Sequence, residues 1–444
     1  MKFFKFFLPG FLIKLLRPIY HSAVARVGGV WFGHPSEKLV VIGVTGTNGK
    51  STTVNLIVQI LEEAGFRTGF TSTVNFNING KEQLNNLKMT MPSGWVLQKW
   101  MSEMVHGGFK YVVLEISSEG LAQGRHKDIN FDVTVFTNLT PEHIESHGGF
   151  ENYKAAKGLL FAALEKLQIT NTKLQINQKL QKTIIVNSDD EYAEYFKSFK
   201  AERYISYGLN NKPDLKATDP KYSPNGISFN LESVQFNLHL KGKFDVYNAL
   251  AAIAVGVSQG ISFEKSRKAI EKISVIPGRM EVVQEKPFSV LVDYAPEPYS
   301  LKALYETIET WPKHRLIHVL GSTGGGRDKA RRKLLGKMAG ETADIVIVTN
   351  EDPYDDDPKE IIHEVADGAV LAGKIIGQNL FRNPDRRGAF AKAFSLAVEG
   401  DLVLITGKGS EQKMAVANGK YIDWDDRKIA REELGYKALH ANKI

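Results

Sequence analysis

Cysteine is absent from the sequence, and its absence excludes several kinds of chemistry at once. The chain cannot form disulfide bonds, build a metal site on thiolates or use a cysteine nucleophile. A long uncharged apolar run is also missing near the N-terminus, where Lys5, Lys14 and Arg17 interrupt a segment rich in phenylalanine and leucine. That segment falls short of the roughly 18 apolar residues that a membrane-spanning helix needs. Any metal ion must be held by oxygen or by histidine.

Positive charge is concentrated at the start of the chain. Residues 1–38 contain six basic residues against the single acidic Glu37, a net charge of +5, whereas the whole chain of 444 residues carries +7. The remainder is nearly neutral and has no basic patch interleaved with aromatic residues, so we expect no nucleic-acid partner. With a hydrophobic fraction of 43%, the chain is long enough for two or three domains with buried cores.

Residues 1–38 form a basic, aromatic N-terminal arm. Pro18 is expected to break any long helix in it. This arm is typical of a helix that lies on an anionic membrane surface, and it predicts peripheral membrane contact through residues 1–30. The alternative is an arm that packs against the protein's own body. The two helical faces that suggest a surface helix carry Phe11, Leu12, Leu15, Leu16 and Ile19 on one side and Lys14, Arg17 and His21 on the other.

The segment 39–53 predicts a phosphate-binding loop. A β-rich run over 39–45 leads into a glycine turn, and apolar residues at helical spacing follow until Gly65 offers a stop. Glycine-rich turns between a strand and a helix direct backbone N–H groups at an anion, and the lysine adds a full positive charge. Val44 stands where the Walker A pattern has glycine, so a glycine-rich turn with an incidental lysine is the alternative. The predicted ATP-binding residues are Gly46, Thr47, Asn48, Gly49, Lys50, Ser51 and Thr52.

Alternating strand and helix patterns predict an α/β fold. Strands are expected at 39–45, 111–116, 132–137 and 183–187, which indicates a central P-loop-type domain with a mainly parallel sheet over residues 39–277. A second series at 289–293, 316–320, 344–349 and 402–406 predicts a smaller Rossmann-like domain over residues 278–444. The polar stretch 170–182 is expected to be a solvated insertion.

Two residues near predicted strand ends suggest a magnesium site. Glu115 ends one strand, and His143 follows another, at the sheet edge where open α/β folds bind ligands. Taken singly, each is more often a surface or capping residue. Beside a phosphate loop they acquire a role, because Mg²⁺ prefers hard oxygen ligands together with water and phosphate.

The order of the motifs resembles the successive signatures of the Mur ligase family, with the UDP-N-acetylmuramoyl-tripeptide synthetases as the most similar branch. The resemblance runs from about residue 39 to the C-terminus. It is carried by the segments 45–52, 115–118, 137–140 with His143, 153–157, 187–190, 277–281, 293–295, 324–329 and 407–411.

The resemblance implies ATP-dependent amide formation on a muramyl-peptide precursor of peptidoglycan. A substrate carboxylate attacks the γ-phosphate, and the amine of a free amino acid then displaces phosphate from the acyl phosphate. It further implies that Lys50 stabilises the transferred phosphoryl group, that Ser51 and Glu115 hold one Mg²⁺, and that His143 holds a second. Lys157 matches a lysine that is carbamylated in the family and then serves as a metal ligand. Without the resemblance, Lys157 would be interpreted as a solvated residue.

Further residues are assigned through the same resemblance. Asn248, Arg279 and Asp293 are expected at the nucleotide, although the family has asparagine where this chain has Asp245. Alternatively, Asn248 caps a helix and Arg279 forms a surface pair. The predicted substrate-binding residues are Thr90, Ser117, Arg125, Arg327, Lys329, Asp352, Tyr354, Gly407 and Glu411.

The segment 351–357 departs from relatives that add diaminopimelate. They have Asp-Asn-Pro-Arg where this chain has Glu-Asp-Pro-Tyr followed by three aspartates, so the arginine for a distal carboxylate is missing. An acidic pocket would favour an amine, and the sequence therefore predicts L-lysine or a similar diamino acid. The alternative is a solvated acidic loop.

The acceptor is less well indicated. Fewer than 40 residues precede the phosphate loop, Met91 replaces the second of two family threonines, and Pro296 replaces a family histidine. We expect a lipid-linked acceptor reached through the arm, cytoplasmic localisation with contact at the inner membrane face, and a monomer. Two other functions stay open: a folylpolyglutamate-like ligase, and a nucleotide-binding, membrane-recruited protein without catalysis.

Overall fold

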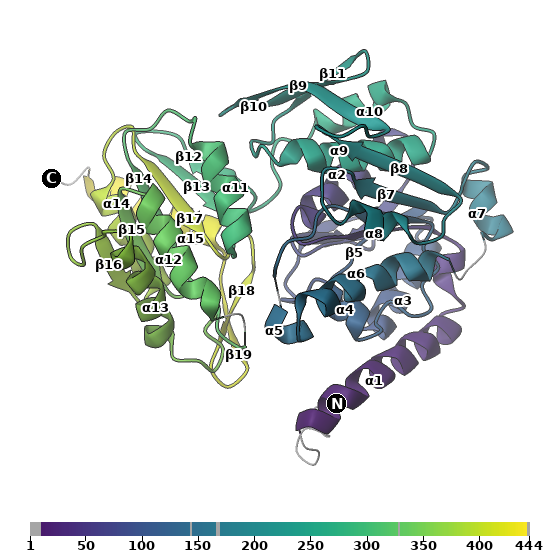
Figure 1. Ribbon diagram of the computed structural model, residues 1–444, viewed down its shortest axis with the longest axis horizontal. Coiled ribbons are helices and arrows are strands. Elements are labelled where there is room, and N and C mark those ends of the chain that lie inside the picture. The colour runs from purple at the N-terminus through teal and green to yellow at the C-terminus, as the bar shows by residue number, and fades with distance from the viewer. Residues whose placement is uncertain (1–9, 143, 166–168, 327–328, 442–444) are drawn as a thin grey trace.

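The computed structural model describes residues 10–142, 144–165, 169–326 and 329–441, and it contains two α/β bodies. Figure 1 shows the larger body, which follows α1 in the chain, and the smaller body side by side, with α1 extending below the larger one. The connection between α10 (Phe263–Ile270) and β12 (Glu281–Gln284) passes from one body to the other, and the expected boundary at residue 277 falls inside it. A cavity between them can therefore combine residues from both sheets.

The larger sheet has its strands in the order β11-β10-β9-β8-β7-β6-β1-β5-β2-β3-β4. Its middle is parallel, with β1 paired to β5 on one side and to β6 on the other. The loops after these three strands consequently meet at one edge of the sheet. The strands are β1 (Val40–Thr45), β2 (Thr68–Thr71), β3 (Asn75–Asn77), β4 (Glu82–Leu84), β5 (Tyr111–Glu115), β6 (Val133–Phe136), β7 (Thr183–Asn187), β8 (Arg203–Gly208), β9 (Leu215–Ser223), β10 (Gly226–Leu231) and β11 (Val234–Leu238).

Helices cover both faces of the larger sheet and create two apolar cores. On one face, α2 (Lys50–Glu63) and α9 (Asp245–Ser258) pack against each other and against α10. On the other face, α3 (Gly94–His106), α4 (Ser118–Ala122), α6 (Phe150–Leu164) and α8 (Ala193–Lys197) enclose the second core. Shorter elements complete this body: η2 (Pro35–Glu37), α5 (Ile144–His147) and α7 (Asn171–Ile176).

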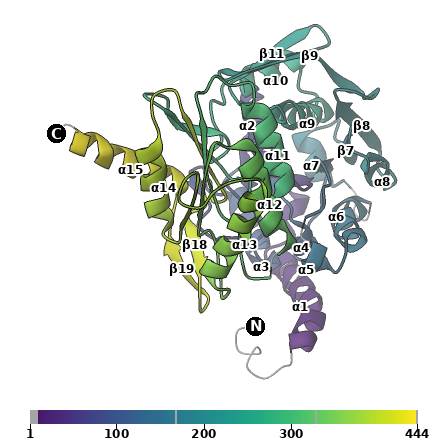
Figure 2. The ribbon, with the colours of Figure 1, turned by 60° about the vertical axis from the view of Figure 1, so that its left-hand side comes forward.

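The smaller sheet has the order β12-β13-β17-β14-β15-β16 and is parallel apart from the β12–β13 pair. Its helices α11, α12 and α13 cover one face, and α14 and α15 the other (Figure 2). The elements are β13 (Ser289–Asp293), α11 (Pro298–Ile308), β14 (Leu316–Leu320), α12 (Ala330–Thr342), β15 (Ile345–Thr349), α13 (Pro358–Leu371), β16 (Leu380–Asn383), α14 (Arg386–Leu396), β17 (Leu402–Thr406), β18 (Lys413–Val416), β19 (Lys420–Asp423) and α15 (Asp426–Ala441).

The α/β fold class expected from the sequence is confirmed, but two local expectations are wrong, the first of them only in part. Most residues of the stretch 170–182 are exposed or half-buried, as expected, but Lys173 and Lys182 reach into the protein and contact the buried Asp132 at 2.6 and 3.1 Å. Burial lowers the pKa of Lys173 to about 8, although Asp132 opposes the shift. A polar sequence alone does not show which lysines are solvated, and these two cations neutralise a buried carboxylate.

The second error concerns α1 (Gly10–Trp31), which runs through Pro18 without ending. A proline removes one backbone donor, and the helix beyond it is held by close packing on the larger body. Ala25 and Gly28 are buried against the start of α3, where Gly94 has no room for a Cβ beside Ala25. Within the described part of the chain, no helix combines the length and apolar character needed to cross a bilayer.

Candidate active site

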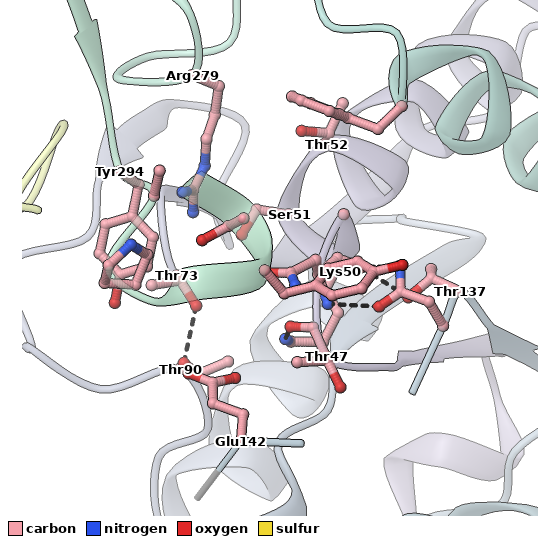
Figure 3. Close-up of a pocket in the computed structure, with 18 of the residues that line it drawn as sticks. Thr47, Lys50, Ser51, Thr52, Thr73, Thr90, Thr137, Glu142, Arg279 and Tyr294 are labelled. Atoms are coloured by element: carbon pink, nitrogen blue, oxygen red, sulfur yellow. Dashed lines mark hydrogen bonds between the residues drawn. The ribbon is translucent and has the colours of Figure 1, made fainter. Parts of the chain in front are cut away.

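A cavity of about 590 Å³ lies where the two bodies meet, and both contribute to its walls. Figure 3 shows Lys50, Ser51, Thr73, Glu142 and Arg279 around this space. The larger body supplies the loops after β1, β5 and β6, and the smaller body supplies the loops after β13, β14, β15 and β17. Most of the site residues predicted from the sequence line it: 47–52, Thr90, Glu115, Ser117, Lys157, Asn248, Arg279, Asp293, Asp352, Tyr354, Gly407 and Glu411.

The phosphate loop is fixed by hydrogen bonds to the segment after β6. The N–H groups of Thr47 and Asn48 donate to the carbonyl and side-chain oxygens of Asn138, each at 2.8 Å. Thr137 Oγ1 donates to the carbonyl of Asn48 at 2.7 Å. Since α2 begins directly afterwards at Lys50, the loop lies at a helix N-terminus, which favours an anion.

Two glycines in this loop are required by space and by backbone conformation. Gly46 and Gly49 have φ of 152° and 80°, a region that other residues rarely occupy. A Cβ on Gly46 would lie 1.9 Å from Thr137 Oγ1, and one on Gly49 would lie 2.2 Å from Asn248 Oδ1. The backbone can therefore approach a phosphate as only glycine allows, and the residues present fit an ATP cradle.

Glu115 connects the phosphate loop to the next loops of the same body. Its carboxylate accepts hydrogen bonds from Ser51 Oγ at 2.7 Å and from the N–H and Oγ1 of Thr73, both at 2.8 Å. Thr73 Oγ1 also lies 2.7 Å from Thr90 Oγ1 (Figure 3). Glu115 and Ser51 thus place two hard oxygen groups next to the loop, which fits Mg²⁺ completed by phosphate oxygens and water. Among the described residues, no cluster of three or more His, Asp or Glu side chains forms a metal site by itself.

Two lysines turn inward beneath the loop. Lys50 Nζ donates to the carbonyl of Thr47, and Lys157 Nζ donates to the carbonyl of Gly46, both at 2.6 Å. Lys157 is only 2% exposed, so it is not the solvated residue that its helix pattern suggests. Burial, followed by repulsion from Lys50, holds the pKa of Lys157 well below its ordinary value. The Lys157 amine therefore has a strong tendency to be neutral.

Of the residues predicted at the nucleotide, Asn248, Arg279 and Asp293 border the cavity, whereas Gly46 is not among the residues that line it. Asn248 is inside α9 and does not cap a helix; its amide donates to Asp245 Oδ1 at 2.8 Å. Burial raises the pKa of Asp245 to about 7. When protonated, this carboxyl is neutral and can donate a hydrogen bond, as can the asparagine that the family has at this position. Arg279 stacks over the ring of Tyr294 at 4.4 Å, and Asp293 accepts from Met280 N–H at 2.7 Å.

The acidic pocket predicted at 351–357 is not formed as expected, because its four aspartates already have partners. Asp352 contacts Lys408 and Lys88, and Asp356 pairs with Arg332 at 3.1 Å. Asp355 accepts from the N–H of Asn418, and Asp357 accepts from the N–H of Lys359 at the start of α13. The argument for a lysine substrate depended on free carboxylates and loses its basis.

Some predicted residues lie elsewhere or are otherwise engaged. Arg125 is outside the cavity lining and bonds Gln123 and the carbonyl of Met91. Lys329 is exposed before α12 and does not line the cavity. Ser117 lines it but accepts from the N–H of Gly120 as the cap of α4. His143 and Arg327 lie outside the described residues.

The sequence analysis missed several residues that complete the cavity. Thr73 and Lys88 follow no motif and were not foreseeable. Glu297 lies two residues beyond a recognised motif, bonds Asn48 Nδ2 across the two bodies at 3.0 Å, and is only 3% exposed. Glu351 begins the segment 351–357, which the sequence suggested only as a determinant of the amino acid; one of its carboxylate oxygens is buried without a hydrogen-bond partner in the described residues, and burial raises its pKa to about 7.

Comparison with known proteins agrees with this geometry. Residues 44–256 match the Mur ligase middle domain, and residues 278–409 match the Mur ligase, glutamate ligase domain. The phosphate loop lies in the first match and the segment 351–357 in the second. The cavity is therefore shared between the two matched domains.

Individual relatives cover most of the chain. A UDP-N-acetylmuramoyl-L-alanyl-D-glutamate–2,6-diaminopimelate ligase of Geobacillus kaustophilus is 36% identical over 92% of this chain and 81% of its own length. A UDP-N-acetylmuramyl-tripeptide synthetase of Roseiflexus sp. is 36% identical over 94% of this chain and 84% of its own.

Solved structures extend the comparison to the fold. A diaminopimelate ligase structure has a TM-score of 0.59 at 29% identity and covers 90% of this chain and 79% of that one. Folylpolyglutamate synthase of Mycobacterium tuberculosis has a TM-score of 0.69 at 16% identity, covering 87% and 92%, which shows the fold alone. With its phosphate loop and a second domain closing one cavity, this chain belongs to the Mur ligase family, whose members are ATP-dependent, ADP-forming amide ligases.

Proposed function

We propose that this protein joins a diamino acid to a muramyl-peptide precursor in peptidoglycan synthesis, with ATP converted to ADP and phosphate. The observation that carries the proposal is the single cavity shared by the phosphate loop and the loops of the C-terminal domain. The chemistry requires a carboxylate, the γ-phosphate and an amine to meet in one water-restricted place. A cavity that belongs to both domains provides such a place when they are closed.

The phosphate side supplies the groups for phosphoryl transfer. Lys50 and the loop N–H groups would stabilise negative charge on the transferred group. Ser51 and Glu115 would hold Mg²⁺, which neutralises phosphate charge when bound, and His143 is proposed as a ligand of a second ion. Lys157 combines burial, a lowered pKa and a position directly under the loop. A neutral buried amine can attack CO₂, lose a proton and become a carbamate, so we propose that Lys157 acts in this modified form.

For the amino acid, we propose 2,6-diaminopimelate in place of lysine. Three of the relatives that match most of this chain carry that substrate in their names. Lys88 and Lys408 neutralise the carboxylates expected to bind an amine, and Arg331 and Lys413 also line this side of the cavity. The cations that line the cavity can serve a distal carboxylate although the arginine of relatives is missing.

Mass spectrometry of the products tests substrate and reaction together. Purified enzyme is incubated with ATP, Mg²⁺, UDP-muramyl-dipeptide and an equimolar pool of amino acids that includes lysine and diaminopimelate. The expected product has gained one diaminopimelate residue, with one phosphate released per bond. Incorporation of lysine in preference would overturn the substrate, and phosphate release with no new amide would overturn the ligase assignment.

We further propose that α1 contacts an anionic membrane surface. Its outward face carries an apolar stripe, with exposed fractions from 44% for Leu16 to 74% for Trp31. Arg17 and Arg26 flank this stripe, and the arm as a whole is strongly basic. The opposite face packs on α3 and leaves this stripe exposed, so packing on the body and contact with a membrane are compatible for α1. An apolar stripe between cations suits shallow insertion among anionic headgroups, which would bring the enzyme to a lipid-linked acceptor. The stripe consists of Leu16, Ile19, Tyr20, Val27, Val30 and Trp31.

Vesicle sedimentation distinguishes this contact from a solvent-exposed helix. We expect binding to phosphatidylglycerol-containing vesicles, weak binding to pure phosphatidylcholine, and roughly a tenfold loss in the variant Ile19→Ser/Val27→Ser/Val30→Ser. Leu371→Ser is the matched control, because Leu371 is 74% exposed on the C-terminal domain. Equal sedimentation of the triple variant and the wild type would refute the membrane contact. Equal turnover of lipid-linked and UDP-linked acceptors on vesicles would refute the lipid-linked acceptor.

A further inference from the structure

One lysine of the central domain reaches into the C-terminal domain. Lys88 lies in the loop between β4 and α3, and its Nζ is 2.6 Å from Asp352 Oδ2 and also contacts the carboxylate of Glu411. The Lys88 side chain is only 8% exposed, so these are not surface ion pairs. Lys408 contacts the same two carboxylates from within its own domain. We call Lys88, Asp352, Lys408 and Glu411 the interdomain ion cluster.

The cluster is balanced only while Lys88 is in place. Two ammonium groups face two carboxylates, and the Lys408 Nζ lies 3.0 Å from both oxygens of Asp352. Although burial opposes the charged form, Glu411 and Asp352 raise the pKa of Lys88 above its ordinary value. Removing one member of a buried pair leaves an uncompensated charge, which is far more costly than losing a surface pair.

The same loop is tied to the phosphate side. Two residues after Lys88, Thr90 Oγ1 lies 2.7 Å from Thr73 Oγ1, and Thr73 donates to Glu115. Glu115 in turn accepts from Ser51 of the phosphate loop. Lys88 itself has a φ of 54°, unusual for a residue other than glycine and typical of positions held by their surroundings. A continuous chain of contacts thus joins the nucleotide side to the C-terminal domain.

We infer that Lys88 is a positioning and specificity residue that assembles the amino-acid side of the cavity when the two domains close. This inference rests on the proposed function, because the interdomain ion cluster borders the part of the cavity where the amino acid would bind. With Lys88 present, Asp352 and Glu411 are neutralised, and this side of the cavity tolerates the distal carboxylate that diaminopimelate has and lysine lacks. Without Lys88, the unbalanced carboxylates repel that distal carboxylate, so diaminopimelate loses more affinity than lysine does.

Steady-state kinetics of Lys88→Met test this role. We expect the KM for diaminopimelate to rise about 100-fold, the KM for ATP to change less than about threefold, and the kcat/KM ratio of lysine to diaminopimelate to rise at least about tenfold. Lys88→Arg keeps the charge and should restore most of the diaminopimelate KM. Lys81→Met is the matched control, because Lys81 is an exposed lysine of the preceding turn. Unchanged amino-acid KM, or an equal rise for ATP and amino acid, would overturn the inference.

A second measurement separates this inference from the ligase assignment. Because the chain has no cysteine, Lys221→Cys and Glu360→Cys allow site-specific dye labelling of one exposed position in each domain. With a non-hydrolysable ATP analogue, energy transfer should report closure in the wild type and less closure in Lys88→Met. Equal closure in both would overturn the role of Lys88 even if the enzyme is a ligase. A loss of domain closure in Lys88→Met would support the role of Lys88 even if the enzyme forms no product.

Discussion

The two walls of the cavity are built in different ways. On the phosphate side, most of the contacts described lie within one domain, as when Thr47 and Asn48 bond Asn138. On the amino-acid side, full charges meet across the domain boundary, and Lys88 pairs with Asp352 at a separation of 264 residues. The first wall is held mainly by the fold of one domain, whereas the second exists only when the domains are together.

With the proposed function, the first wall serves phosphoryl transfer and the second serves the selection of the amino acid. A wall preorganised within one domain can stabilise phosphoryl transfer without further rearrangement. A wall completed by domain closure admits the amino acid only in the closed arrangement and can distinguish among candidates by charge. Substitutions on the phosphate side should therefore lower turnover, and those on the amino-acid side should change KM, selectivity or pH response.

The largest effect is expected for Lys157→Ala on the phosphate side. The change removes the buried amine beneath the loop, and kcat should fall by about a thousandfold or more. Bicarbonate with the wild type, or a short carboxylic acid with the variant, should raise activity if a carboxylate-like group is what the site needs. Phosphate release measures the outcome.

Lys154→Ala provides the matched control for this position. Lys154 lies one turn earlier in α6 and pairs with Glu151 at the surface. Its loss should change kcat by no more than about twofold. Full activity of Lys157→Ala would contradict the assignment of Lys157 and remove the contrast between the walls.

A smaller loss is expected for Glu115→Gln, which keeps the shape of the side chain but removes its charge. Glu115 accepts from Ser51 and Thr73, so the substitution replaces one accepting oxygen with an NH₂ donor, and the group that donated to that oxygen must find another acceptor. We expect kcat/KM to fall about 100-fold and the Mg²⁺ concentration for half-maximal activity to rise about tenfold. Magnesium titrations measure both, with the exposed Glu119→Gln as control. An unchanged Mg²⁺ requirement would show that Glu115 does not serve the metal.

On the amino-acid side, we expect Glu351 to make the free energy of unfolding depend on pH. Burial raises its pKa from 4.5 to about 7, with Arg331 opposing and Asp352 adding to the shift. Between these values the folded protein keeps a proton that the unfolded chain has lost, so the free energy of unfolding falls as pH rises. The slope from this group is at most about 1.4 kcal/mol per pH unit, and it levels off above the folded pKa.

Glu351→Gln has no proton to lose and should therefore gain stability relative to the wild type from about pH 5 to pH 7. Urea unfolding of the C-terminal domain at several pH values measures the difference. The exposed Glu360→Gln should show a flat difference over the same range. A flat difference for Glu351→Gln as well would mean that this carboxyl ionises normally in the folded protein.

The smallest effect is expected for Lys329→Ala. Lys329 was predicted to bind substrate, but it is exposed and lies outside the cavity lining, whereas Arg331 two residues later lines the cavity. Lys329→Ala should change the amino-acid KM by no more than about twofold, and Arg331→Ala should change it more. A tenfold rise in the amino-acid KM of Lys329→Ala would mean that Lys329 does bind substrate, and that the amino-acid site extends beyond the cavity lining.

The elements that sequence reasoning located are those with a strong local pattern. The predicted strands near residues 40, 111, 289, 316 and 402 are present, because continuous apolar runs of this length fit a parallel sheet covered on both faces. The antiparallel strands β9, β10 and β11 were not predicted. In β9, only Leu215 and Ala217 are buried, and a charged segment with Pro220 obscures the alternation.

The site residues likewise divide into those with a local sequence pattern and those without one. The glycine turn and Glu115 were recognisable because each lies next to a strand end. The buried state of Lys157 required the family resemblance, since a lysine within a helix gives no sign of burial. Lys88 gave no signal at all, and the acidic run at 351–357 gave a misleading one.

The sequence by itself determined that a strand, a glycine turn and a helix would follow one another over residues 40–63, because each of these depends on neighbouring residues. Only the tertiary structure decided which charges remain free. Asp352 is an acidic residue in an acidic run by sequence, and one member of a balanced cluster in the fold. Its partners come from a distant loop and a distant strand end, and electrostatic pairing depends on distance in space, which no local pattern records.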